Sequence, residues 1–283
     1  MIAMQTPANS AGTRYQPVAG RSRLTWAFLD AMVLAKRSIL QTFRVPELLV
    51  FVTIQPVMFV LLFRYVFGGA IHVPGGQYVN FLMPGIFVQT VAFGGVATGI
   101  GLAEDMHRGL IDRFRSLPMA SSAVLTGRTI ADLARNLFTV IIMLLVGFAV
   151  GFRPGGTIFE FLLGILVLMA FSYGFSWVSA FIGLAVRSVE AAQSAGFIWL
   201  FPLTFASSAF VPVDSMPSWL QAFARHNPVS VLSDALRGLF HVNPALTSAD
   251  TRWALMQSLG WTLAILLVFV PISVIRYRRS TAR

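Results

Sequence analysis

The chain has 283 residues, of which 56% are hydrophobic and only 11% are charged, and its formal net charge is +10. Soluble domains carry about 25% charged residues, and a soluble core of this size could not bury so much apolar material, so the composition predicts an integral membrane protein. The absence of cysteine excludes disulfides, zinc thiolate sites, iron–sulfur clusters and thiol nucleophiles.

The first 45 residues contain no membrane span. Residues 1–23 are polar and lack the apolar core of a signal peptide, so we expect a disordered tail. Within residues 24–45, the apolar side chains of Leu24–Phe43 share one half of a helical wheel, which predicts an interfacial helix on the inner leaflet. Pro46 then breaks the chain before the first span. The residues singled out for the interfacial helix are Trp26, Phe28, Met32, Lys36 and Arg37.

Six apolar segments follow, each long enough to cross the hydrocarbon core, which takes about 20 helical residues. Turns containing Gly and Pro separate most of them. The predicted spans are Leu48–Phe67, Val79–Ala103, Thr129–Gly151, Ile158–Val186, Ala191–Val211 and Trp253–Ile275. The sequence therefore predicts an all-α fold with six transmembrane helices.

The placement of arginine and lysine predicts the orientation of these spans. Fifteen of these side chains fall on the side that holds both termini and the loop after the second span, and four fall on the other side. Positive charge gathers on the cytoplasmic side of membrane proteins. We therefore expect both termini in the cytosol and the chain in the cytoplasmic (inner) membrane, with a lipid surface rather than nucleic acid as the partner of the positive charge.

The loop of residues 104–128 concentrates charge between the second and third spans. Placed on a helix, its segment Arg108–Leu117 has an apolar face and an opposite charged face, and Pro118 ends the helix. The apolar face holds Leu110, Ile111, Phe114 and Leu117, and the charged face holds Arg108, Asp112 and Arg115. Spacing alone leaves two interpretations open: a solvated loop helix, or a docking surface for a cytosolic partner.

The energy source for transport favours the docking interpretation. A proton-driven exporter needs ionisable groups at membrane depth, and we expect the carboxylates to avoid that depth; Asp132, for example, lies near the end of its predicted span and can pair with Arg135. A phosphate-binding G-x-x-x-x-G-K-[ST] loop needs a lysine, and Lys36, the single lysine, follows no glycine loop. If the chain pumps, its power would then come from another polypeptide, and no cofactor is expected on this chain.

Polar and aromatic residues inside the spans are candidate contacts for a hydrophobic cargo, because such sites combine aromatic walls with a few polar groups. Serine and threonine in spans also bond helix to helix, so this second interpretation stays open. The candidates for the substrate path are Gln55, Gln89, Phe93, Tyr173, Ser176 and Trp177. An intramembrane enzyme or metal site is not expected, because the four histidines lie in loops and form no metal-spacing pair.

Residues 212–252 form a long loop on the outer side. Two short apolar-faced pieces lie between Pro212 and Pro244, interrupted by Pro217 and Pro228, and each is too short to span. They can dip into the outer leaflet or cap a cavity; the alternative is a surface loop with interfacial aromatic residues.

Several strings in the chain resemble the permease subunits of type-2 ABC exporters, in particular the daunorubicin/doxorubicin-resistance group. They are Glu104–Asp105 with GLIDRFRSLPMA, GFRPGG after the third span, and FPLTFASSAFVPVDSMPSWLQAFARHNPVSVLSDALRGLF over Phe201–Phe240. The similarity runs from about Leu24 onward, so residues 24–283 resemble one type-2 ABC transmembrane domain.

The resemblance implies two permease copies, expected as a homodimer, with two copies of a separate ABC ATPase subunit. The charged loop would supply a coupling helix seated in the ATPase, and re-entrant helices from Phe201–Phe240 would close the outer mouth around Phe210, Trp219 and Phe223. The implied cargo is a hydrophobic or amphipathic drug-like molecule; a lipid or glycoconjugate, or an ion-coupled mechanism, are the alternatives. The implied docking residues are Glu104, Asp105, Arg108, Leu110, Ile111, Asp112, Arg113, Phe114, Arg115, Leu117 and Pro118.

Overall fold

The computed structural model describes residues 46–71, 73, 76–107 and 121–280. The predicted disordered tail, the interfacial helix and the docking residues from Arg108 to Pro118 lie outside this part. The described residues form helices and turns without a strand. In chain order the helices are α2 (Pro46–Leu61), the π-helix η1 (Leu62–Phe67), α3 (Tyr78–His107), α5 (Ser121–Ala149), α6 (Ile158–Ala185), α7 (Val189–Phe205), the 3₁₀-helix η2 (Val213–Ser215), α8 (Ser218–His226), α9 (Pro228–Leu239) and α10 (Ser248–Ser280).

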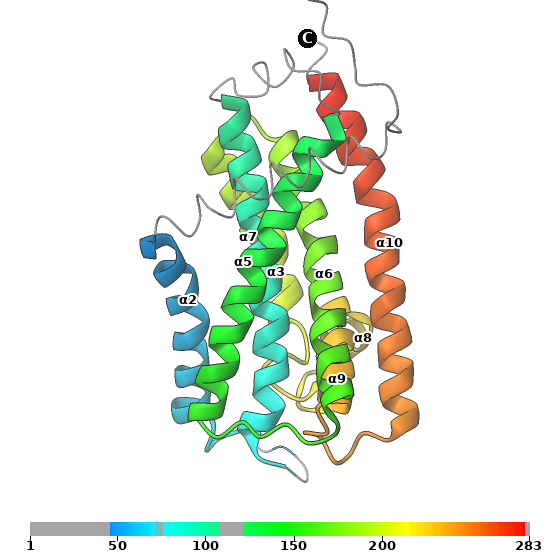
Figure 1. Cartoon of the computed structure of the whole chain (residues 1–283). Coiled ribbons are helices and arrows are strands. Elements are labelled where there is room, and N and C mark those ends of the chain that lie inside the picture. Colours follow the sequence, from blue (N-terminus) through cyan, green and yellow to red (C-terminus); the bar gives the residue numbers. More distant parts are fainter. Residues whose placement is uncertain (1–45, 72, 74–75, 108–120, 281–283) are drawn as a thin grey trace, which may run out of the picture.

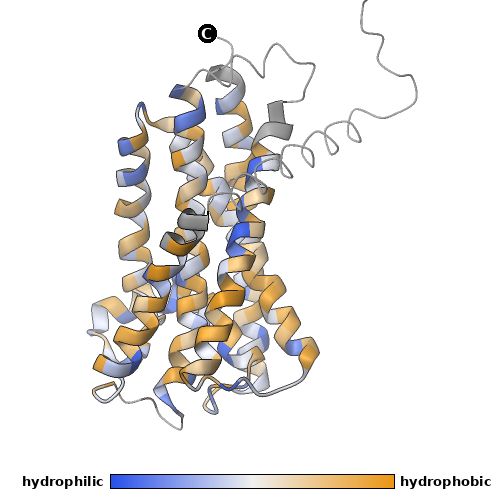
Figure 2. Ribbon diagram, turned by 60° about the vertical axis from the view of Figure 1, so that its left-hand side comes forward, coloured by the Kyte–Doolittle hydropathy of each residue, from blue (hydrophilic) through white to orange (hydrophobic). Residues whose placement is uncertain are grey.

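The long helices stand side by side in one bundle (Figure 1). The short helices α8 and α9 lie at one end, which we call the hairpin end. The other end carries the last turns of α3 and α10 and the first turn of α5, and we call it the C-terminal end. Apolar residues cover most of the length of the helices (Figure 2), as expected for a bundle in lipid.

Four described helices are long and apolar enough to cross a membrane: Tyr78–His107, Leu125–Ala149, Ile158–Ala185 and Ser248–Tyr277. They match four of the six predicted spans. The first predicted span is helical over Pro46–Phe67, but it changes from α- to π-helix at Leu62. The fifth, predicted over Ala191–Val211, is helical only over the 17 residues of Val189–Phe205. Beyond Phe205, the carbonyl oxygen of Ala206 accepts from Nδ2 of Asn227, and the carbonyl oxygens of Ser208 and Ala209 accept from a side chain of α9.

Helix α3 is the axis of the bundle, because it packs against α2, α5, α6, α7 and α9. In its most apolar window 78% of the residues are buried, against 17% for α10. Glycine makes the contact with α6 possible: a Cβ at Gly99 would collide with the carbonyl oxygen of Ser179, and a Cβ at Gly183 would collide with the backbone of Gly99. Small residues that let two backbones approach are a common means of joining helices in a membrane.

Replacing Gly99 by alanine should therefore separate α3 from α6 and lower the stability by about 1–3 kcal/mol, the usual cost of overpacking. The matched control is Gly260→Ala on α10, where a Cβ meets nothing within 4 Å and the higher helix propensity of alanine predicts no loss. Thermal unfolding of the detergent-solubilised protein, followed by tryptophan fluorescence, would show a lower midpoint for Gly99→Ala alone. Equal midpoints would contradict this packing.

Candidate functional site

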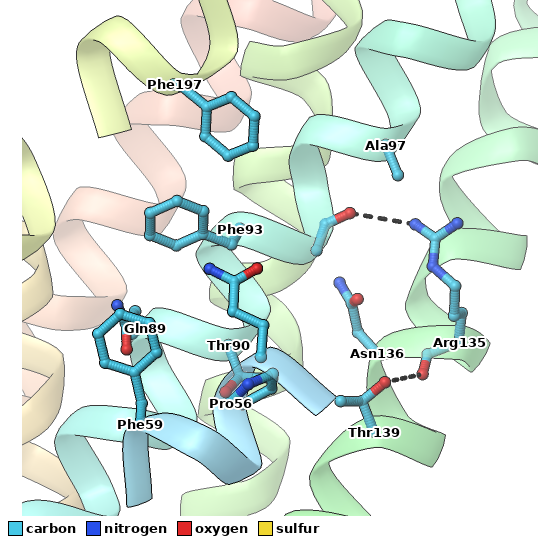
Figure 3. A pocket seen from close by; sticks show the side chains of 12 residues that line it. Pro56, Phe59, Gln89, Thr90, Phe93, Ala97, Arg135, Asn136, Thr139 and Phe197 are labelled. Atoms are coloured by element: carbon cyan, nitrogen blue, oxygen red, sulfur yellow. Dashed lines mark hydrogen bonds between the residues drawn. The ribbon is translucent and has the colours of Figure 1, made fainter. Parts of the chain in front are cut away.

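A cavity of about 120 Å³ lies between α2, α3, α5 and α7 (Figure 3). Its volume is close to the ~150 Å³ that holds one benzene molecule in an engineered protein cavity, so it can take one ring or the head of a larger molecule. The lining residues are Gln55, Pro56 and Phe59 from α2, Gln89, Thr90, Phe93, Gly94 and Ala97 from α3, Arg135, Asn136 and Thr139 from α5, and Phe197 from α7.

The two sides of this cavity differ in chemistry. Figure 3 shows the rings of Phe93 and Phe197 on one side and the side chains of Arg135 and Asn136 on the other. The centroids of the two rings are 5.9 Å apart. Such a combination of aromatic wall and few polar groups is typical of sites for amphipathic small molecules.

A continuous series of phenylalanine rings leads from the cavity toward the hairpin end, and we call it the phenylalanine track. On α7 the ring of Phe201 lies 5.4 Å from that of Phe93 and 5.5 Å from that of Phe205. Beyond α7, Phe210 lies 5.3 Å from Phe205 and 4.5 Å from Phe63. The members of the track are Phe59, Phe63, Phe67, Phe93, Phe197, Phe201, Phe205 and Phe210.

The track follows from spacing in the sequence. Its members recur every four residues on α7, at 197, 201 and 205, and again through α2 and η1, at 59, 63 and 67. Residues four apart share one helix face, so each helix carries a column of rings; the column on α7 contacts Phe93 of α3, and Phe59 contacts Phe205. Only Phe93 and Phe210 of this set were expected from the sequence to have a role, although the four-residue spacing was a usable signal.

A series of polar contacts joins α3 to α5 from the C-terminal end to the cavity, and we call it the polar ladder. The first contact is the ion pair of Asp105 with Arg128. In the second, the hydroxyl of Thr98 donates to Asp132. In the third, Nη2 of Arg135 pairs with Asp132 at 2.7 Å and donates to the carbonyl oxygen of Gly94 at 3.1 Å. These contacts fix how α5 lies against α3.

A second polar cluster lies at the hairpin end, around Arg237 of α9, which is fully buried. Its guanidinium donates to the carbonyl oxygens of Phe81 at 3.0 Å and Ser208 at 2.7 Å, and it pairs with Asp234 at 2.7 Å. It also stacks on the ring of Phe81, 3.6 Å from the centroid. Arg237 therefore ties α9 to both α3 and the segment after α7.

Comparison with known proteins identifies the family of this bundle. A model of the ABC-2 type transporter family matches residues 30–241. The chain belongs to the ABC-2 type transporter family.

Named members of the ABC-2 family are similar to most of the chain. The daunorubicin resistance ABC transporter permease protein DrrB1 of Streptomyces coeruleorubidus is 34% identical over 237 residues, covering 84% of this chain and 82% of that protein. The probable doxorubicin resistance ABC transporter permease protein DrrC of Mycobacterium tuberculosis (strain H37Rv) is 26% identical over 81% of this chain and 80% of its own. A putative transport permease, ycf38, of Cyanophora paradoxa is 25% identical over 88% of each chain. The resemblance to permeases of drug-resistance exporters is thus confirmed.

The structure of this ABC-2 chain divides the predicted substrate-path residues into two groups. Gln55, Gln89 and Phe93 line the cavity together. Tyr173, Ser176 and Trp177 lie away from it on α6: the ring of Trp177 is 2% exposed within a cluster that includes Tyr277, and its carbonyl oxygen accepts from Ser273 of α10. Ser176 donates to the carbonyl oxygen of Ser172, one turn earlier in the same helix, so this bond joins no second helix.

The predicted outer-gate residues are also separated. Phe210 is buried in the phenylalanine track, and its carbonyl oxygen accepts from the hydroxyl of Tyr78 at 2.9 Å. Trp219 is 74% exposed and Phe223 is 50% exposed, both on α8. Of the predicted docking residues, Glu104 and Asp105 lie in the last turn of α3, where Asp105 joins the polar ladder.

Asp132 lies deeper than the sequence analysis expected. Helix α5 begins at Ser121, eight residues before the predicted span, so Asp132 is three turns inside the helix and only 5% exposed. The expected pairing with Arg135 is confirmed. Thr98 and Arg135 together satisfy this carboxylate, which is why it can be buried.

Removing the Arg237 side chain should strongly destabilise the hairpin end. Arg237→Met leaves the Asp234 carboxylate and the carbonyl groups of Phe81 and Ser208 without their donor, and breaking a buried ion pair costs about 3–5 kcal/mol. The control is Arg225→Met, since Arg225 and its partner Asp214 are 61% and 88% exposed and exposed pairs contribute about 0–1 kcal/mol. Limited proteolysis between α7 and α9 should accelerate for Arg237→Met only; equal rates for the two variants would refute the tether.

Proposed function

We propose that this chain is the permease subunit of an ATP-driven exporter that moves hydrophobic or amphipathic small molecules out across the cytoplasmic membrane. It would act as a homodimer with two copies of a separate ATP-binding subunit, and ATP and Mg²⁺ would bind that subunit. The observation that carries the proposal is a cavity with one aromatic and one polar side, inside a bundle of the ABC-2 transporter family. The drug-resistance names of the relatives support this class of cargo.

In this proposal the chain crosses the membrane six times. The helix formed by α2 with η1 and the helix α7 would complete the four long spans, with both termini and the C-terminal end in the cytosol. Residues 24–283 would form the single transmembrane domain, and the hairpin end would face outward. The arginine and lysine distribution of the sequence supports this orientation.

The phenylalanine track gives the cargo a route from the cavity to the outer face. Its rings are partly exposed where they could meet a passing molecule: Phe201 is 44% exposed and Phe205 is 43% exposed. Rings in series offer many similar contacts of about 0.5–1.5 kcal/mol each. A hydrophobic molecule can therefore exchange one ring for the next without leaving apolar surroundings.

The polar ladder gives the partner subunit a means to act on the cavity. Residues 108–120, where the docking residues lie, connect α3 to α5, and the ladder begins beside them with Asp105 and Arg128. Its last contact, between Arg135 and the carbonyl oxygen of Gly94, lies in the wall of the cavity. A push on the connecting segment would thus reach the cavity through two helices that move together.

Reversing the docking charges should uncouple the exporter. We expect Arg113→Glu with Arg115→Glu to abolish co-purification of the ATP-binding subunit and to abolish export, while the amount of chain in the membrane stays unchanged. The control is Arg225→Glu, an exposed arginine of the hairpin end, which should keep both. Full retention of binding and export by the double variant would argue against docking at this loop.

Shortening the track should weaken transport without affecting assembly. Phe205→Ala removes ring contacts to Phe201 and Phe210, so the Nile red concentration that gives half-maximal efflux should rise about 2–10-fold, corresponding to one aromatic contact. Phe159→Ala is the matched control, because Phe159 is 80% exposed on α6. Unchanged Nile red efflux by Phe205→Ala, measured in cells that also produce the ATP-binding subunit, would exclude this route.

A further inference from the structure

The guanidinium of Arg135 has more hydrogen-bond donors than the protein uses. A guanidinium carries five N–H donors. Nη2 is engaged by Asp132 and by the carbonyl oxygen of Gly94. Nε is buried without a partner, and no acceptor for Nη1 is found among the described residues. Nε is too deeply buried for an outside molecule to reach, so the donors that an acceptor from outside the chain could use are those of Nη1.

The carboxylate of Asp132, which forms the ion pair with Arg135, has a partner for each of its oxygens. One oxygen of Asp132 pairs with Arg135, and the other accepts from the hydroxyl of Thr98. Asp132 does not line the cavity, and no other carboxylate does so in the part of the chain described. The charged group at the cavity wall is therefore a hydrogen-bond donor. Its neighbours in the wall, Gln89 and Thr90, are uncharged: Gln89 is 4% exposed, and the buried hydroxyl of Thr90 has no partner.

The cavity wall opposite Arg135 is aromatic and favours a ligand with an aromatic ring. Phe59, Phe93 and Phe197 line it, and aromatic side chains pack favourably against other aromatic faces. Because the cavity holds about 120 Å³, it encloses one ring and its substituent rather than a whole drug-sized molecule.

We propose that this cavity recognises an aromatic group bearing a hydrogen-bond-accepting oxygen, a carbonyl or a carboxylate, which binds Arg135 while the ring lies against the phenylalanine wall. This assignment rests on the proposed export function and specifies its cargo class. An ammonium group is disfavoured, because it would bring a second cation to Arg135 and would find no free carboxylate in the cavity wall.

Three probes that each carry one benzene ring, the size that the cavity encloses, test the assignment: acetophenone, benzoate and benzylamine. Each is equilibrated by dialysis with the purified full-length chain in lipid nanodiscs, and binding to empty nanodiscs is subtracted. We expect the ketone and the carboxylate to bind about tenfold more tightly than the amine, the strength of a hydrogen bond to a charged group. If the carboxylate binds more tightly than the ketone, its negative charge also contributes to binding. The proposal is supported whichever of these two oxygen compounds binds more tightly. An amine that binds as tightly as the two oxygen compounds overturns it.

Two variants locate the binding site. Asp132→Asn with Arg135→Gln removes the guanidinium without leaving an unpaired carboxylate, and it should reduce binding of the oxygen compounds about tenfold while amine binding stays the same. Phe93→Ala should weaken all three probes, which a site elsewhere would not show. Unchanged affinities in both variants would overturn the assignment, and the ranking on the unmodified chain stands as a test even where a variant fails to fold.

The export assays separate this inference from the proposed function. If the amine binds best while the Arg113 and Arg115 reversals still abolish Nile red efflux, the cargo class is wrong and the exporter function stands. If efflux survives those reversals, the proposed coupling fails, whatever the probes show.

Discussion

The constraint on which this structure depends is that polar groups inside a membrane find their partners within the protein, since lipid offers none. Arg237 at the hairpin end and the polar ladder between α3 and α5 both satisfy it, and each fixes the position of a helix in doing so. Beyond the end of helix α7 at Phe205, the carbonyl oxygen of Ser208 accepts from Arg237. Arg135 satisfies the constraint incompletely, and its spare donors mark the place where we infer that an outside molecule completes the bonding.

Glycine and phenylalanine have different roles along α3: the glycines allow close packing, and Phe93 contributes a ring. Gly94, Gly99 and Gly101 leave room on this helix for the side chain of Asn136, for the α6 backbone and for Arg128, respectively. Phe93, on the same helix, turns toward α7 and begins the series of rings. One helix therefore holds the bundle together through its small residues, and in the proposed function the same helix would offer cargo a surface through Phe93.

Much of the fold could be predicted from the sequence, because apolar length alone identifies helices such as α6 and α10. Pro217 and Pro228 also marked where α8 and α9 begin. The start of α5 was harder to predict: the helix begins inside the charged loop, where hydropathy is low, so the sequence did not indicate that Asp132 lies three turns inside it and is buried. The cavity was found only in part, since Arg135 and Phe197 join Gln89 through packing between distant segments that no local pattern encodes.

The bonds of Arg237 also set an order of assembly. Its acceptors lie 156 and 29 residues earlier in the chain, on Phe81 and Ser208. Both segments are therefore synthesised first, and α9 can be seated only once they have met; loop closure over such separations is slow compared with forming a helix. A chain whose earlier helices have mispaired would therefore offer the guanidinium no acceptors and would leave a buried charge unpaired, which is strongly destabilising.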